Sequence, residues 1–585
     1  MRTSLRHLLA AGLGIAAIAP GALASSTIRS ETSLLKRSTM GQVPSSGATL
    51  LVTFDGTPSG VDVVRALGDL GRVRQSVPDA GIWELVPMNA ATVRADVVRR
   101  AGVVRAEWSM TRRLSAFPAT RRPAIPALPQ IAVADPSDPR YVDGVGGQWS
   151  MHTGRWNPSL TGQTNRPIIA ILDAGLDTTQ NEWKAPGITV APWSTGRNIP
   201  SAPDISISGH GTHVAGIAAA PIDGNGVVGV APASAAHPVM PVQVVLNSAG
   251  SSTDATIMAG ITYAVNHGAK VINISSGGPG YSQAFQDTVN WATKRGAIIM
   301  ASVGNEGLQD NGLNFPAGYD HVIGVGAQCD GVVDSPYCPT AYGRAAFSNS
   351  NFSVDVLAPG VNILSTLASG VADMTEPSGY GRMDGTSMAS PFVAGTAALV
   401  FSSHPGATPF QVGRLIEMSG SRAVAGFKRN DTAGWGVVSP VKAVTTTAPV
   451  NDITEPNDDV NWVPTNFNIT LPSWARTKTF SAYADYNDDP MDVYAISLYR
   501  GKRVRVTITS STAVLRAYAF NGAGRISPRI MSDASFVKRF EGGTRYATPT
   551  KRAFVFTAKT TGRHYLQILT FRGGGNYSVK LERLN

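Results

Sequence analysis

GTSMASPFVAGTAALVF, residues 385–401, places a serine among small residues directly before a long apolar run. The run is compatible with a buried helix, so Ser387 is expected close to a helix N-terminus. Backbone N–H groups at that end have no partner within the helix, and the helix dipole favours negative charge there. Ser387 is therefore a candidate nucleophile, although an isolated serine at such a place is more often a helix cap.

The chain upstream of this stretch alternates strand-like and helical patterns. Residues 254–268 and 282–296 have the length and pattern of crossover helices. Such alternation predicts an α/β fold with a parallel sheet and helices on both faces, whose site lies beyond the strand ends. The strand-like runs are PIIAIL (167–172), PVMPVQVVL (238–246), KVINISS (270–276), AIIMASV (297–303) and HVIGVGA (321–327).

Two upstream motifs offer partners for the serine. DAGLD starts at Asp173, directly after the first strand-like run, and HGTHVAG starts at His210. A serine hydroxyl needs a base within hydrogen-bond reach, and imidazole suits this role because its ordinary pKa is about 6.5. A carboxylate must then hold the imidazole in the correct tautomer. Two alternatives stay open for isolated motifs: Asp173 as a strand-end cap, and His210 with His213 as metal ligands.

Together with ASVGNEG (301–307), these motifs occur in an order that resembles the subtilisin-like serine proteases, or subtilases. The resemblance covers roughly residues 141 to 445 and implies the same α/β fold and peptide hydrolysis. An oxyanion hole needs hydrogen-bond donors, which an Asn amide can supply. The resemblance implies a role for each residue: Asp173 as orienting acid, His210 as general base, Ser387 as nucleophile, Asn305 and the Ser387 backbone N–H as oxyanion donors, and His213 as a structural residue.

The resemblance also implies a substrate-binding strand. Ser275, Ser276 and Gly277 would form an extended edge that pairs with the substrate backbone. Gly277 and Gly304 would leave room for the substrate side chain before the scissile bond, and Glu306 would admit a basic one. Met388 follows the nucleophile, so its oxidation to the polar sulfoxide is expected to impair turnover.

No cofactor is expected for the chemistry, but a structural Ca²⁺ is one reading of the loop at Asp223. Asp223-Gly224-Asn225-Gly226 resembles the family's calcium loop, and Glu182 matches the partner carboxylate. Calcium takes several oxygen ligands, many of them backbone carbonyls, so a metal-free glycine turn remains the alternative. Cys329 and Cys338 are the two cysteines, and a local disulfide is expected after export.

The N-terminal part predicts export and maturation. Residues 1–24 have a basic start, an apolar stretch and a small-residue site ending at Ala24, which together indicate a signal peptide. Residues 25–115 contain a β-α-β-β-α-β pattern over 48–109, which predicts a ferredoxin-like fold. In subtilases such a unit is commonly an inhibitory propeptide, and the alternative is an independent binding domain. Residues 116–140 are a Pro/Ala/Arg-rich linker, expected to be exposed and cut during processing.

The part that follows the catalytic region (141–447) differs in composition and charge. Residues 451–585 contain short β-type runs separated by turns, which predict an all-β sandwich resembling the pre-peptidase C-terminal domain of secreted bacterial proteases. The net charge of +10 divides into +7 for residues 1–140, −5 for 141–450 and +8 for 451–585. Docking of the C-terminal domain on anionic surfaces or acidic proteins is one hypothesis, and a solvated basic surface is the other.

These observations predict a secreted serine endopeptidase made as a preproprotein. Its partners would be protein or peptide substrates and its own propeptide. No nucleic acid is expected, since no recognition motif accompanies the positive charge, and no membrane span is expected either. Two alternatives remain: a subtilase-fold exopeptidase such as a tripeptidyl-peptidase, and an inactive surface-binding protein with the same fold.

Overall fold

The structure, a computed structural model, describes most of the chain after residue 47. Its residues fall into two units, one up to Pro456 and the other holding the C-terminal strands. The expected signal peptide and most of the expected linker lie outside the described residues. Those described are 48–90, 92–114, 117–118, 138, 147–152, 155–162, 166–333, 337–371, 379–426, 429–449, 451, 455–456, 469–470, 477–485, 491–521, 540–543, 551–572 and 574–585.

A parallel seven-stranded sheet forms the centre of the first unit, and it contains all five predicted strands. Its order is β15-β14-β13-β11-β7-β9-β8, and every neighbouring pair is parallel. The order reverses at β7, because β9 and β11 lie on opposite sides of it; this is a switch point where sites form. The strands are β7 (Ile168–Asp173), β8 (Trp193–Ser194), β9 (Val239–Gln243), β11 (Ala269–Ile274), β13 (Ile298–Ser302), β14 (Val322–Gln328) and β15 (Val356–Pro359).

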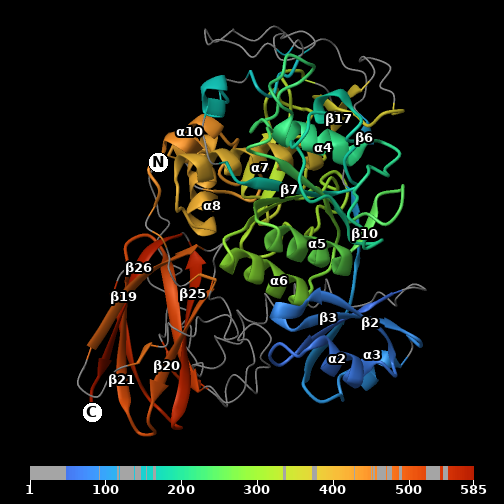
Figure 1. Cartoon of the computed structure of the whole chain (residues 1–585). Coiled ribbons are helices and arrows are strands. Elements are labelled where there is room, and N and C mark those ends of the chain that lie inside the picture. The colour runs from blue at the N-terminus through green and yellow to red at the C-terminus, as the bar shows by residue number, and fades with distance from the viewer. Residues whose placement is uncertain are drawn as a thin grey trace, which may run out of the picture. The chain divides into compact units, whose positions relative to one another are not determined.

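Helices cover both faces of this sheet, which confirms the predicted fold class (Figure 1). One face carries α5 (Asp254–Asn266) and α6 (Gln283–Lys294), and the other carries α4 (His210–Ala219) and α7 (Thr386–Ser403). Every residue of α7 from Thr386 to Phe401 is buried, as expected for a helix that is apolar all round. The remaining helical segments are η2 (Pro158–Gly162), η3 (Asn181–Trp183), α8 (Pro409–Met418), α9 (Ser421–Val424) and α10 (Pro440–Thr445).

The N-terminal domain, residues 48–108, is a four-stranded antiparallel sheet with two helices. Its order, β2-β3-β1-β4, and its element sequence give the predicted ferredoxin-like arrangement. Its sheet packs on α5 and α6, and α2 and α3 lie away from them (Figure 1). The elements are β1 (Leu50–Phe54), α2 (Gly60–Leu67), β2 (Gly71–Val77), η1 (Pro78–Ala80), β3 (Ile82–Pro87), α3 (Val93–Val97) and β4 (Val103–Trp108).

Polar side chains of this domain meet the starts of α5 and α6. The Glu107 carboxylate accepts hydrogen bonds from the backbone N–H groups of Gln283 (3.1 Å) and Ala284 (2.9 Å), the first two residues of α6. A carboxylate is favourable there because the first N–H groups lack helical partners. Arg105 forms an ion pair with Asp287 on the same helix, at 3.0 Å. The N-terminal domain thus contacts the parallel-sheet unit partly through a side chain that accepts hydrogen bonds from the free N–H groups at the start of α6.

Two short strands continue the chain beyond this domain. β5 (Thr111–Leu114) lies between β10 (Ser251–Thr253) and β12 (Ser276–Gly277), antiparallel to both. β6 (Phe117–Pro118) joins the hairpin formed by β16 (Ile363–Thr366) and β17 (Tyr380–Asp384).

Three residues of the predicted linker are described, and each makes a contact with a distant part of the chain. Phe117 and Pro118 pair with β17, and Asp138 is buried. Composition alone does not indicate such contacts, because an irregular, Pro-rich sequence can still hydrogen-bond to the edge of a strand.

The C-terminal unit is the predicted β-sandwich. Its sheets have the orders β18-β20-β25-β22-β23 and β19-β26-β21-β24. Alternate residues such as Val504, Val506 and Ile508 enter a shared apolar core, while Arg503 and Arg505 are exposed. The strands are β18 (Ile469–Thr470), β19 (Thr477–Asp485), β20 (Met491–Leu498), β21 (Arg503–Ser510), β22 (Val514–Asn521), β23 (Phe540–Gly543), β24 (Lys551–Thr557), β25 (Gly562–Arg572) and β26 (Gly574–Arg583).

Within the described part of the chain, no helix combines the length and the apolar character needed to cross a membrane.

Candidate active site

The three predicted catalytic residues lie at the ends of elements in the parallel-sheet unit. Asp173 is the last residue of β7, His210 is the first residue of α4, and Ser387 is the second residue of α7. All three side chains are buried. Strand ends and helix starts are the places where the sequence predicted the site of a parallel α/β sheet.

Asp173 and His210 form a buried hydrogen-bonded pair. Asp173 Oδ1 lies 2.8 Å from His210 Nδ1 and also accepts the Ala174 backbone N–H at 2.7 Å. Burial alone would lower the pKa of His210, but the Asp173 and Asp204 carboxylates outweigh it, and the pKa lies above its usual 6.5. In the described structure, Nε2 of His210 is buried and has no hydrogen-bond partner. The pair has the geometry of a base held by an acid.

Ser387 is held by an exchange of hydrogen bonds with Ser275. Its Oγ donates to the Ser275 carbonyl at 3.0 Å, and Ser275 Oγ donates to the Ser387 carbonyl at 2.9 Å. The Ser387 carbonyl needs this partner because its helical donor would be residue 391, a proline without an N–H. Asn273 continues the network, since it binds Ser275 Oγ at 2.9 Å and accepts from Ser390 at 2.7 Å.

Asn305 lies beside the start of α7. Its Oδ1 accepts the backbone N–H of Thr386 at 3.0 Å and the Thr386 hydroxyl at 2.9 Å. Because both bonds need an acceptor, the atom of the side-chain amide at this end must be Oδ1, and Nδ2 lies at the other end. Such a fixed amide is suited to donate to a developing oxyanion near Ser387.

Asp204 positions the histidine helix and was not predicted from the sequence. Its carboxylate accepts the N–H and hydroxyl of Thr212, each at 2.8 Å, and it also binds Ser206. Ser206 Oγ in turn accepts the His210 backbone N–H at 2.8 Å. These groups cap the first turn of α4, whose N-cap residue Gly209 has no side chain. An acidic residue shortly before a helix start was the available signal.

His213, expected to be structural, is bonded to backbone groups. Its Nε2 lies 3.0 Å from the Ile363 carbonyl and 3.1 Å from the Gly381 carbonyl, so this nitrogen carries the proton. A metal cannot share that nitrogen, and His210 uses its Nδ1 for Asp173. One nitrogen of each ring is thus committed to a protein partner, and among the described residues no three His, Cys, Asp or Glu side chains gather as metal ligands would.

The predicted substrate edge carries a segment of this chain. Ser276 pairs with Leu114, and Gly277 pairs with Arg113, in antiparallel register. Asp384, three residues before Ser387, pairs with Phe117. β5 is therefore paired directly after Ser275, and β6 is paired shortly before Ser387 in the sequence.

Side chains occupy the space beside the two predicted glycines. A Cβ on Gly277 would clash with Asn314 Nδ2. A Cβ on Gly304 would clash with Glu306 Oε2 and would lie 2.6 Å from Asn349 Nδ2. Asn314 is buried and donates to the Ser302 carbonyl at 3.0 Å. Glu306 lies at this place too and accepts from Asn349 at 3.1 Å. Asn314 was missed because it follows no motif.

The loop at Glu182 and Asp223 contains buried carboxyl oxygens. Glu182 accepts from the Tyr380 hydroxyl at 2.7 Å and the Val227 N–H at 3.1 Å. Burial is the main cause that raises its pKa to about 8, and Asp223 and Asp138 add to it. Glu182 Oε2 and Asp138 Oδ2 have no partner among the described residues. Among the residues that the structure describes, however, no three His, Cys, Asp or Glu side chains gather as metal ligands would.

Cys329 and Cys338 form the expected disulfide, with their Cα atoms 5.7 Å apart. Both are buried with Phe347 in a small apolar cluster outside the catalytic motifs. Met388, the residue after the nucleophile, is fully buried in α7.

The fold, the acid–histidine pair and the serine at a helix start are those of a serine protease. Comparison with known proteins agrees. The sequence profile of the Subtilase family matches residues 164–436. Subtilisin from Bacillus pumilus is 39% identical over 252 residues, which are 43% of this chain and 82% of that protein. The chain belongs to the subtilase family and is a serine protease.

Fervidolysin from Fervidobacterium pennivorans is similar in sequence over part of the chain and in fold over more of it. It is 35% identical over 263 residues, which are 43% of this chain and 36% of fervidolysin. Its crystal structure, described as that of a keratinolytic enzyme related to subtilisin, gives a TM-score of 0.60. That likeness covers 91% of this chain and 94% of fervidolysin at 20% identity, so it concerns the fold.

Proposed function

We propose that this protein is a secreted serine endopeptidase, made as a preproprotein that cleaves its own chain. The observation that supports this most is the pairing of Leu114 with Ser276 and of Phe117 with Asp384. An internal segment of the chain occupies strand edges on both sides of the serine, as an endopeptidase substrate would. A tripeptidyl-peptidase would need a free N-terminus close to the serine instead.

The proposed reaction begins when the Ser387 hydroxyl turns from the Ser275 carbonyl to His210 Nε2. Oγ attacks the peptide carbonyl carbon while Nε2 takes its proton, and Asp173 stabilises the imidazolium. The Asn305 amide and the Ser387 backbone N–H donate to the oxyanion. Nε2 then gives the proton to the leaving amine as the C–N bond breaks, and water releases the acyl group by the same steps. No cofactor takes part.

The residue numbers suggest which bond is cut during maturation. β5 ends at Leu114 and β6 begins at Phe117, so three peptide bonds join the two strands. Ser275, whose carbonyl binds Ser387 Oγ, directly precedes β12, and Ser387 follows shortly after β17. We propose the middle bond, between residues 115 and 116, as the processing site. N-terminal sequencing of the mature enzyme tests this, and a start other than residue 116 contradicts it.

Covalent labelling tests the enzyme proposal directly. A fluorophosphonate probe, applied to the mature enzyme, is expected to modify Ser387, with the site mapped by mass spectrometry. Ser387→Ala should remove labelling and self-cleavage, whereas Ser403→Ala, at the far end of the same helix, should keep both. Labelling elsewhere, or none in the wild type, would instead favour the inactive surface-binding alternative. Cleavage of N-terminally blocked peptides separates an endopeptidase from an exopeptidase.

A structural Ca²⁺ is part of the proposal. Buried oxygens without a partner at Glu182 and Asp138, close to Asp223, are the groups that would hold it, together with backbone carbonyls. A cation would neutralise acidic side chains that otherwise repel one another. Calcium is expected to raise the melting temperature and EDTA to lower it. Equal melting temperatures in both solutions would contradict the site.

We also propose that the C-terminal domain docks on anionic surfaces or acidic proteins. Residues 451–585 carry a net charge of +8, and Arg503 and Arg505 are exposed on β21. The isolated domain, which has its own apolar core, should be retained by an anionic matrix at low salt and released at high salt. Equal retention by a neutral matrix would overturn this.

A further inference from the structure

One arginine of β5 is buried in the body of the protein. The side chain of Arg112 is fully buried, whereas its neighbours Thr111 and Arg113 are exposed and Leu114 is half-buried. Consecutive side chains of a strand point to opposite faces, so β5 sends Arg112 inward and Arg113 outward. A buried guanidinium is rare unless it is paired and hydrogen-bonded, so its surroundings must supply those partners.

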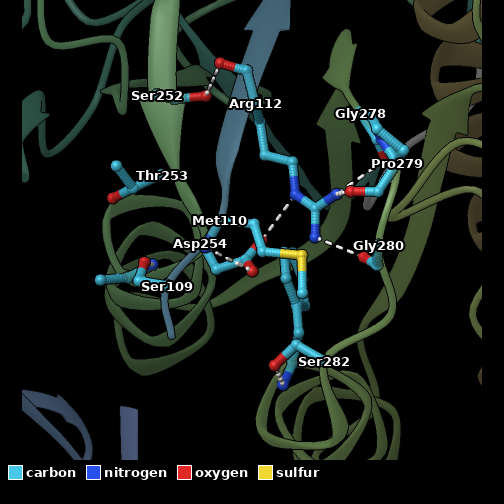
Figure 2. Close-up of polar contacts among 12 residues, drawn as sticks. Ser109, Met110, Arg112, Ser252, Thr253, Asp254, Gly278, Pro279, Gly280 and Ser282 are labelled. Carbon is cyan, nitrogen blue, oxygen red and sulfur yellow. Dashed lines mark hydrogen bonds and ion pairs between the residues drawn. The ribbon is translucent and has the colours of Figure 1, made fainter. Parts of the chain in front are cut away.

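The surroundings of Arg112 match a guanidinium on three sides (Figure 2). Nε donates to Asp254 Oδ1 at 2.6 Å. Nη1 donates to the carbonyls of Gly278 and Pro279, both at 2.7 Å, and Nη2 donates to the Gly280 carbonyl at 2.9 Å. Every one of these acceptors belongs to the catalytic body, on α5 or on the turn after β12. We call Asp254 and residues 278–280 the arginine pocket.

The carboxylate of the pocket is built into the body. Asp254 is the first residue of α5, where the helix dipole stabilises a negative charge, and the Thr253–Thr256 capping box fixes this helix start. Its second oxygen accepts the Met110 backbone N–H at 3.1 Å. Burial would lower the pKa of Arg112, but Asp254, with a smaller contribution from Tyr319, outweighs it, and the pKa of Arg112 is raised.

The backbone pairing makes the pocket available to other chains. Arg112 lies opposite Ser252 on β10, and the next residues pair with Gly277 and Ser276 of β12. These contacts use main-chain groups, which any peptide has. A substrate bound along the same edges would place its corresponding side chain in the arginine pocket.

We propose that Asp254 and the carbonyls of residues 278–280 form a specificity pocket for arginine in the protein substrates of this enzyme. The arginine lies two residues before Leu114, the residue that pairs with Ser276. It is therefore the fourth residue before the bond between residues 115 and 116. The inference rests on the proposed endopeptidase activity and adds a substrate class to it. Arg112 in the propeptide occupies the pocket as a substrate arginine would.

The pocket selects the shape of the cation as well as its charge. Carboxylate and carbonyl oxygens surround a planar group with five N–H donors, four of which they use. A lysine ammonium offers three donors at one point and cannot reach all sides. Citrulline keeps the shape and loses the charge, so it leaves Asp254 buried beside a neutral group. An aliphatic side chain leaves every acceptor without a donor.

A peptide series tests the pocket on the mature wild-type enzyme. Internally quenched peptides carry the sequence of residues 109–118, SMTRRLSAFP, with citrulline, lysine or leucine at the Arg112 position. Citrulline and leucine are expected to lower kcat/KM by about 100-fold or more, and lysine by at least about tenfold. Citrulline at the Arg113 position is the matched control and is expected to change kcat/KM by less than about threefold, because that side chain is exposed.

The outcomes separate the two proposals. If no peptide is cleaved, the endopeptidase proposal fails, and this inference fails with it. If all peptides are cleaved equally, or leucine is preferred, the arginine pocket alone is overturned. Asp254→Asn should reduce the arginine-to-citrulline ratio to below about tenfold, and an unchanged ratio would exclude Asp254 as the determinant. The peptide series on the wild type remains decisive if that variant fails to fold.

Discussion

The catalytic body and the N-terminal domain are stabilised in different ways. The body buries almost the whole of α7 between a parallel sheet and other helices. The N-terminal domain has a smaller core, a cluster of ten buried residues. Its sheet packs on α5 and α6, and charged and polar groups such as Glu107 and Arg105 add to this contact. Apolar burial therefore maintains the body, whereas the N-terminal domain is joined to it partly by polar contacts that single substitutions can weaken.

This difference predicts that the two regions control different quantities. Changes at the body site should alter the chemical step, since they act on groups around Ser387. Changes at the polar contacts of the N-terminal domain should alter its release and leave the mature enzyme untouched, because that domain is then gone. A contact variant that changes kcat of the mature enzyme would break the comparison.

The largest effect is expected for Ser387→Ala in the body. It removes the attacking oxygen, and kcat should fall by about 10⁶-fold, the size of the loss for the serine of subtilisin. Peptide hydrolysis by a variant matured with added wild-type enzyme measures it after that enzyme has been inactivated and removed. Ser403→Ala is the control and should retain full kcat.

Asp173→Asn should lower kcat by about 10⁴-fold, because the amide no longer holds His210 in the correct tautomer. It also tests the pH dependence. His210 must be neutral to accept a proton, so wild-type activity falls as the pH drops through its raised pKa. Without the Asp173 charge that pKa falls, and the acid limb of kcat/KM should move to lower pH. An unmoved limb would show that Asp173 does not set the pKa of His210.

Asn305→Ala should lower kcat by about 10²- to 10³-fold with little change in KM, because an oxyanion donor acts in the transition state. Asn305→Asp is the sharper variant. It keeps an acceptor for the Thr386 N–H and hydroxyl and loses the N–H donor. Both variants should therefore be impaired, the Asp variant at least as strongly because its negative charge repels the oxyanion, and a fully active Asp variant would assign Asn305 a merely structural role.

The smallest effect is expected at the contacts of the N-terminal domain. Glu107→Gln weakens the interaction with the start of α6, so activity should be released from the full chain about three- to tenfold faster. The time course of peptide hydrolysis after refolding measures this. Asp69→Asn, which removes an exposed ion pair with Arg100, should change it by less than about twofold. The kcat of the mature enzyme should be the same in all three.

Motifs and periodicity predicted the fold and the places of the catalytic candidates. The apolar runs before Asp173 and after Ser387 have the length and composition of buried elements, so their ends could be located by counting. The β-α-β-β-α-β pattern likewise predicted the N-terminal domain. Composition did not indicate that Phe117, in the predicted linker, pairs with β17.

The supporting residues could not be found in this way. Asp204, Asn273 and Asn314 act through hydrogen bonds that no motif indicates, although Asp204 had a local signal in its place shortly before a helix start. Asn273 lies inside an apolar strand, where a single polar residue gives no indication of its partner. Only the folded chain joins it to Ser275 and Ser390.

The sequence by itself determined the family, the order of the domains and the candidates Asp173, His210, Ser387 and Asn305, because local patterns and motifs carry that information. Only the tertiary structure decided that Arg112 is buried and Arg113 is exposed, although the two are identical neighbours. The difference depends on which face of β5 meets the body, and on Asp254 and three carbonyls lying there. The position of a charge relative to distant oxygens is set by folding, and it decides whether an arginine is solvated or recognised.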